Sequence, residues 1–199
     1  MAALGNPEGP HWLSAMSDEP QPLIEAATFL DRTIRVFLTQ DGSLQAETWI
    51  VAVARMAGTL ILRNHLPVGA AEPAAPLLSA AADQEGPRLV RLLLLTLNHL
   101  GLDLEESSIE VPPGGTGCAQ LSLAATRERL EPLVMACGRS HGLGLGETAD
   151  ALMITTALAI HTCQEVLPVH RGTGLAVAGL VEGAKTMAAT PGALATSQP

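Results

Sequence analysis

The chain has 199 residues, enough for one domain with a substantial core that needs no disulfide or metal to stabilise it. Hydrophobic residues make up 47% of the chain and charged residues 16%, and the net charge is -9. This acidic balance excludes the basic surface typical of nucleic-acid-binding proteins and disfavours anionic lipid, so we expect no nucleic-acid partner and no membrane partner.

Aromatic residues make up only 2% of the chain, so the core must consist of aliphatic side chains and methionine. Strands usually contain more aromatic and β-branched residues, so this composition favours helices. Ten of the eleven basic residues are arginine, a bias that is typical of a GC-rich, bacterial genome.

Residues 1–19 are rich in glycine, proline and serine and predict a flexible leader. Pro20 and Pro22 suit the first turn of a helix. The apolar stripe of this first helix recurs at helical spacing and comprises Leu23, Ala26, Ala27, Leu30, Ile34, Phe37 and Leu38.

A second helix is predicted from Ala46 to Arg63, and its middle part carries a single charge, Arg55. A helix that is apolar nearly all round is typical of the centre of a bundle. Ala54 and Gly58 are small residues one turn apart, which indicates a close approach by another helix. Residues 64–83 are rich in proline and predict a long connection.

A third helix is predicted over residues 85–100, a fourth over 126–137, a fifth over 147–166 and a sixth over 172–188. Between the third and the fourth, two short alternating segments flank a turn rich in proline and glycine, which predicts a small β-hairpin near residues 109–123. Residues 189–199 predict a disordered tail. The fold class is therefore all-α, a bundle of five or six helices in a single domain over residues 20–188.

Two stretches of the chain run in parallel. Glu47-Thr48 and Glu147-Thr148 each open a helix that is poor in charge, and Leu66-Pro67-Val68 and Leu167-Pro168-Val169 each follow its end. We therefore predict two related three-helix halves, residues 20–101 and 119–188, although strings this short also coincide by chance.

The histidines and cysteines give no metal-binding pattern. Cys137 and His141 are four residues apart, and so are His161 and Glu165, but neither pair has the spacing of a zinc finger or ribbon. We expect no metal site and no cofactor, and retain His141 and His161 as candidate ligand-binding residues.

Catalytic motifs are also missing from the sequence. Gly142-Leu143-Gly144-Leu145-Gly146 precedes a helix, but Glu147 stands where a phosphate-binding loop carries lysine. There is no Gly-x-Ser-x-Gly nucleophile motif. Cys137 with His141 is the remaining nucleophile pair, but Cys137 ends an apolar run, so we expect a buried and inert thiol and favour a protein that is not an enzyme.

Arg55 and Thr59 are the remaining candidates, one turn apart on the buried helix. A buried arginine must be paired. The structural interpretation is a salt bridge to Glu47, Glu147 or Asp150; the functional interpretation is a pocket that holds a carboxylate or phosphate, which arginine binds through two hydrogen bonds.

The low charge and the surplus of aliphatic residues favour a non-enzymatic helical module that self-associates, as a homodimer, or binds a protein partner. The alternative is a small-molecule-binding or metal-binding helical protein, with Arg55, Thr59, His141 and His161 near a site between the central helices. The start of the chain does not resemble a signal peptide and no apolar run reaches the length of a membrane span, so we expect a cytoplasmic protein.

Overall fold

The computed structural model describes residues 20–39, 42–66 and 75–186. These residues form six α-helices and contain no β-strand, which confirms the predicted all-α bundle. The predicted leader and tail lie outside the described residues. The elements are α1 (Pro20–Leu38), α2 (Ala46–His65), α3 (Ala75–His99), the single-turn 3-10 helix η2 (Glu106–Ser108), α4 (Leu123–Ser140), α5 (Leu145–Cys163) and α6 (Val169–Lys185).

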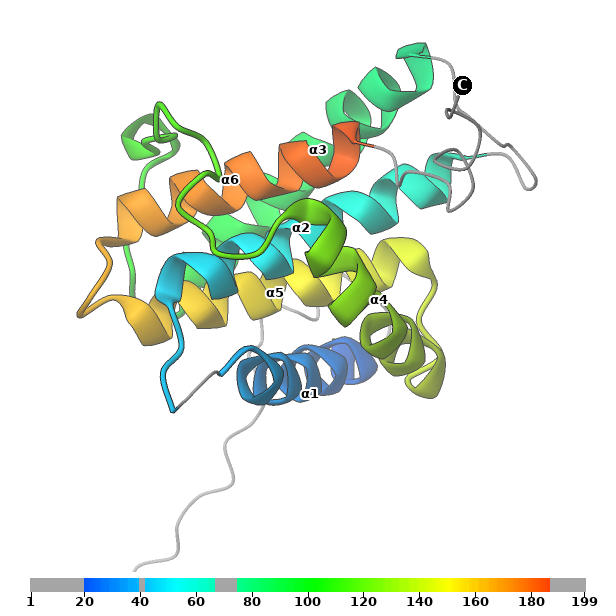
Figure 1. Ribbon diagram of the computed structural model, residues 1–199, viewed down its shortest axis with the longest axis horizontal. Coiled ribbons are helices and arrows are strands. Elements are labelled where there is room, and N and C mark those ends of the chain that lie inside the picture. The colour runs from blue at the N-terminus through cyan, green and yellow to red at the C-terminus, as the bar shows by residue number, and fades with distance from the viewer. Residues whose placement is uncertain (1–19, 40–41, 67–74, 187–199) are drawn as a thin grey trace, which may run out of the picture.

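The helices are arranged in three layers of two (Figure 1). Helices α2 and α5 form the middle layer, with α1 and α4 on one side and α3 and α6 on the other. Every residue of α2 from Thr48 to Leu62 is buried, as the sequence predicts for the central helix. Its partner α5 is buried nearly as completely from Thr148 to Ile160.

Helices α2 and α6 approach each other so closely that their contact requires glycine. A Cβ atom added at Gly58 would lie 2.1 Å from the carbonyl oxygen of Leu180, and one added at Gly183 would lie 2.1 Å from that of Arg55. Glycine lowers helix propensity, so in α6 it is retained at the expense of local stability. The predicted close approach at Ala54 and Gly58 is confirmed, and its partner is α6.

The predicted hairpin near residues 109–123 is wrong, because helix α2 takes the hydrogen bonds that a strand ladder would need. The amide of Gln120 donates to Thr48 Oγ1 at 2.9 Å, and the carbonyl oxygen of Leu121 accepts from Arg55. Pro112 and Pro113 have no amide hydrogen to donate. The segment is an irregular loop that crosses the bundle.

Helix α3 begins at Ala75, about ten residues earlier than predicted. Pro76 is tolerated there because the first-turn amides have no partner within the helix. Pro87 lies inside α3 and does not end it. Residues 67–74 of the predicted connection lie outside the described residues.

The helix packing has an approximate two-fold pattern, but the division into two related halves stays a prediction. Exchange of α1 with α4, α2 with α5 and α3 with α6 maps the packed helix pairs onto one another: α1 packs on α5 as α4 packs on α2, and α2 on α6 as α5 on α3. Buried positions of α1 and α4 differ by 100 residues, as in the pairs Leu23 and Leu123, Leu30 and Leu130, and Ile34 and Val134. Glu47-Thr48 and Glu147-Thr148 have the same separation.

No single helix among the described residues is long and apolar enough to cross a membrane. Helices α4 and α5 meet that test only as a pair, which is bent by 112° at its break.

The contact between α2 and α6 predicts the effect of added methyl groups. Gly58→Ala should lower the free energy of unfolding by about 1–3 kcal/mol, because its Cβ atom would meet the backbone of α6. Gly86→Ala in α3 is the matched control, since its Cβ atom would meet nothing within 4 Å. Urea unfolding measures both, and equal stability of the two variants would contradict the close contact.

Candidate functional site

Arg55 is only 4% exposed and connects three parts of the chain. Its Nε donates to Glu182 Oε2 at 2.8 Å, its Nη2 to Thr116 Oγ1 at 2.9 Å and its Nη1 to the carbonyl oxygen of Leu121. Thr116 Oγ1 in turn donates to the same Glu182 oxygen at 2.6 Å. Arg55 therefore holds the loop that precedes α4 against α2 and α6.

The predicted partners of Arg55 are wrong, because the close approach of α6 brings Glu182 to it instead. Two of the predicted carboxylates have other roles: Glu147 accepts from the amide of Gly144 at the start of α5, and Asp150 pairs with Arg88 at 2.8 Å.

A second buried arginine, Arg127 of α4, lies beside the first and is 7% exposed. Its Nε donates to Thr59 Oγ1 at 3.0 Å, and its Nη2 donates to the carbonyl oxygens of Gly183 and Thr186 at the end of α6. Thr59 Oγ1 donates to the carbonyl oxygen of Arg55 at 2.9 Å. We call Arg55, Thr59, Arg127 and Glu182 the arginine cluster.

Loss of hydration on burial lowers the pKa of Arg127, and the attraction of Glu131 opposes this only in part. The hydrogen-bond acceptors of this guanidinium are a hydroxyl and two backbone carbonyls. They include the last carbonyls of α6, where the helix dipole is negative and favours a cation.

Sequence reasoning missed Arg127, although a signal was present. Leu123, Arg127, Leu130 and Val134 follow the 3.6-residue period of one helix face, and all four are buried. An arginine in such a stripe indicates a buried charge. Glu182 gave no comparable signal, because its side chain is 31% exposed and lies at the edge of the buried face.

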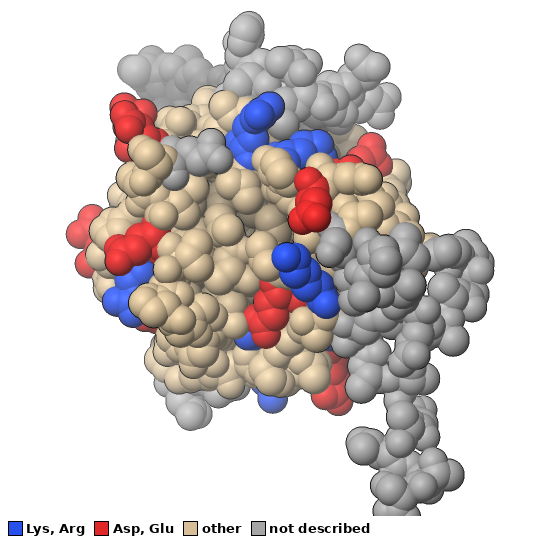
Figure 2. Space-filling view, turned by 90° about the horizontal axis from the view of Figure 1, so that it is seen from above, with Lys and Arg blue, Asp and Glu red and all other residues tan. Residues whose placement is uncertain are grey.

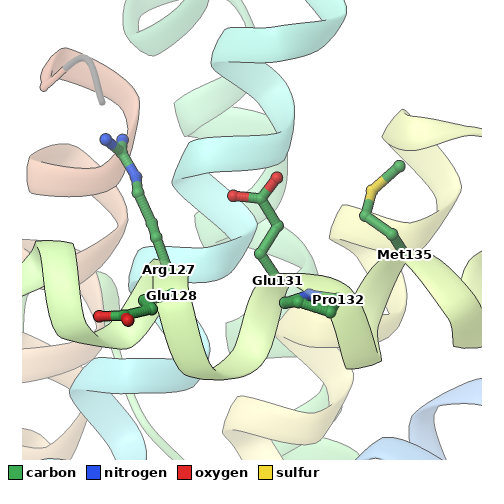
Figure 3. Close-up of a pocket in the computed structure, with 5 residues that line it drawn as sticks. All are labelled: Arg127, Glu128, Glu131, Pro132 and Met135. Carbon is green, nitrogen blue, oxygen red and sulfur yellow. The ribbon is translucent and has the colours of Figure 1, made fainter. Parts of the chain in front are cut away.

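A hollow of about 280 Å³ opens beside the cluster (Figure 3). The described residues that line it belong to α4: Arg127, Glu128, Glu131, Pro132 and Met135. Arg127 extends toward the end of α6 and Glu131 toward α2 (Figure 3). Glu131 pairs with Arg63, and Arg127 is bonded as described above, so the protein itself already uses the main charged groups of this hollow.

The three-layer fold does not itself require the arginine cluster. Three of its members have uncharged, buried residues 100 positions away in the other predicted half. Thr155, Ala159 and Ala27 correspond to Arg55, Thr59 and Arg127. There, Thr155 Oγ1 simply donates to the carbonyl oxygen of Ala27 at 3.1 Å. Buried charges are weak contributors to stability, so the cluster serves a local purpose, which is to fasten the crossing loop and the end of α6.

The structure unites only two of the four predicted site residues, Arg55 and Thr59. His141 lies at the end of α4, where its Nδ1 is 3.6 Å from Cys137 Sγ and 3.1 Å from Ser140 Oγ, and its ring is 6.2 Å from that of Phe29. His161 is half-buried near the end of α5. Ligand binding by these four residues stays a prediction.

The contact between Cys137 and His141 lacks the features of a nucleophile pair. Cys137 is 2% exposed, and burial raises the pKa of its thiol, which disfavours the reactive thiolate. Within the described ranges, no group of three or more histidine, cysteine, aspartate or glutamate side chains is arranged to hold a metal ion.

The chain matches no protein-family model, no curated protein and no solved structure.

The arginine cluster predicts an unequal effect of two arginine substitutions. Arg55→Met should lower the free energy of unfolding by about 1–3 kcal/mol, because it removes the charged partner of Glu182 and leaves the carbonyl of Leu121 without its donor. Arg129→Met, at an exposed position of α4, should have little effect. Urea unfolding of both variants tests this, and an unchanged stability of Arg55→Met would show that the cluster is dispensable.

The carboxyl of Asp31 in α1 predicts a pH effect. Burial raises its pKa above the usual 3.8, against the attraction of Arg35 and Arg32, and one of its oxygens is buried without a hydrogen-bond partner in the described part of the chain. A raised pKa means that ionisation opposes folding, so the stability associated with the protonated carboxyl is complete below pH 3.8 and is lost as the pH rises through the folded-state pKa.

Asp31→Asn should therefore be more stable than the wild type at neutral pH, and the two should converge in acid. Urea unfolding at both pH values and one protein concentration measures this difference. A variant that is less stable at neutral pH would mean that the ionised carboxylate is favoured in the folded protein.

Proposed function

We propose that the protein is a non-enzymatic interaction module that forms a symmetric homodimer through the outer face of α1. The observation that carries this proposal is the position of the two phenylalanines, the only ones in the chain. Phe29 is 45% exposed and Phe37 53% exposed, although the sequence pattern assigned Phe37 to the buried stripe. Val36 between them is 77% exposed.

These side chains belong to a continuous second face of α1. Its central line, spaced by four, four, three and four residues, consists of Gln21, Glu25, Phe29, Arg32 and Val36, all exposed. We call this line the α1 stripe. Aromatic side chains are the residues that contribute most to protein interfaces, and in so aromatic-poor a protein their placement on the surface favours a contact.

The charges of the α1 stripe favour a second copy of the chain as the occupant. In a two-fold contact, the same surface of each protomer meets itself. Antiparallel pairing about Phe29 stacks Phe29 on its own copy, and it places Glu25 beside the copy of Arg32 on both sides. Gln21 then meets the copy of Val36. A parallel pairing would instead place like charges together.

We also propose a cytoplasmic location. It is supported by Cys118, Cys137 and Cys163, which are all free thiols and therefore suit a reducing compartment.

Native mass spectrometry or light scattering at micromolar concentration tests the dimer. The wild type should be dimeric and Phe29→Asp monomeric, because a carboxylate would be buried at the two-fold axis. Leu95→Asp on α3 is the matched control, since Leu95 is 46% exposed and should leave the dimer intact. A monomeric wild type would refute the proposal.

Charge reversal tests the antiparallel geometry separately. Glu25→Arg alone and Arg32→Glu alone should each weaken the dimer by about tenfold, because each replaces two attractive pairs by two repulsive ones. The double variant should regain the wild-type dissociation constant. A double variant as weak as the single ones would contradict the antiparallel pairing.

A further inference from the structure

The loop between η2 and α4 touches α6 at two separate points. At Gly174 the backbones meet directly, because a Cβ atom added there would lie 1.8 Å from the carbonyl oxygen of Glu110. At Glu182 the loop is held by the hydrogen bond from Thr116. These points are eight residues apart, or about 12 Å along the helix.

Between the two points the loop stands away from α6 and leaves a groove of about 540 Å³. This volume lies within the range of small-molecule sites, about 300–1,000 Å³. The residues that line it are Val111, Gly114, Gly115, Thr116, Val177, Ala178, Val181, Glu182 and Lys185. Val111 is 51% exposed and Val181 40% exposed. A ligand in the groove would cover these two apolar side chains.

The groove lies on the side of the molecule formed by α3 and α6. Figure 2 views that side and shows a surface where uncharged residues predominate and charged residues are scattered. The face of α6 that bears Val177 and Val181 is opposite the glycine face that packs on α2, so it lies away from that contact.

The polar groups of the groove define the charge of a ligand. The carboxylate of Glu182 is neutralised by Arg55 at 2.8 Å and also accepts from Thr116. Lys185, the only lysine of the chain, is exposed one turn beyond Glu182 and forms no salt bridge within the described residues. The groove therefore combines an apolar floor with one available positive charge at its end.

We propose that this groove binds a small apolar molecule that carries one anionic group, with the apolar part on Val177, Ala178 and Val181 and the anion beside Lys185. The arginine cluster positions the site, because Arg55 fixes Thr116 and Glu182 and so holds the outer wall in place. The groove does not involve the α1 stripe, so failure of one proposal would leave the other unaffected.

Two dyes of nearly the same shape test the proposal. Anilinonaphthalene sulfonate is an apolar anion, and phenylnaphthylamine is its uncharged analogue. In fluorescence titrations of the full chain, the anionic dye should bind at one saturable site per chain, roughly twofold to fivefold more tightly than the neutral dye. Equal affinity for the two dyes would overturn the assignment of an anionic ligand.

Substitutions then locate the dye. Ala178→Phe should abolish binding by filling the groove without adding charge, and Val181→Asn should weaken it by making the floor polar. Lys185→Ala should still bind both dyes, but it should no longer bind the anionic dye more tightly than the neutral one. Leu95→Asn, on the exposed face of α3, is the control and should bind as the wild type does.

Circular dichroism tests whether each variant is folded. If Ala178→Phe does not fold, the affinity of Val181→Asn for the dye tests the site by itself. If Ala178→Phe and Val181→Asn both bind the anionic dye as tightly as Leu95→Asn does, the groove is not the binding site.

Discussion

The contact between α2 and α6 is the constraint on which the rest of the structure depends. Gly58 and Gly183 allow the two backbones to approach, and this approach has a consequence for charge as well as for packing. It places Arg55 of α2 against Glu182 of α6, where a wider helix spacing would leave a buried arginine without a carboxylate. The same approach brings the last carbonyls of α6 within reach of Arg127 from α4. Close packing and the polar interior are therefore one arrangement.

Comparison of the two predicted halves separates features that recur in the bundle from features that are local to one side. Helices in corresponding places pack in corresponding pairs, and aliphatic side chains recur at several buried positions of α1 and α4. The halves differ where Arg55, Thr59 and Arg127 have Thr155, Ala159 and Ala27 as counterparts. The second set builds an equally buried contact without charge. The charged set is thus tied to what is unique to its side of the molecule, the loop that crosses α6.

The proposed dimer face and the proposed groove lie on opposite outer layers of the bundle, on α1 and on α6 (Figure 1). Each surface combines exposed apolar side chains with charges, and these charges favour one type of occupant over others. In α1 the charges are of both signs and suit a second copy of the same helix. In the groove the single free charge is positive and suits an anion. A chain so rich in aliphatic residues has more apolar surface than one core can hide.

The sequence by itself determined the fold class, the central position of the second helix and the small residues of its close contact. These features follow from local quantities: periodicity, the scarcity of charge, and the size of Ala54 and Gly58. Tertiary structure decided the partners of the buried charges and the conformation of the loop before α4, because these features depend on segments far apart in the chain. The partner of Arg55 lies 127 residues away. The amide of Gln120 and the carbonyl of Leu121 are bonded to α2, so an alternating pattern typical of a hairpin became a loop. Phe37 shares the helical period of buried residues, and only the packing of the described residues shows that its side chain is 53% exposed. The spacing of residues along one helix does not determine which other segment of the chain packs against each of its faces.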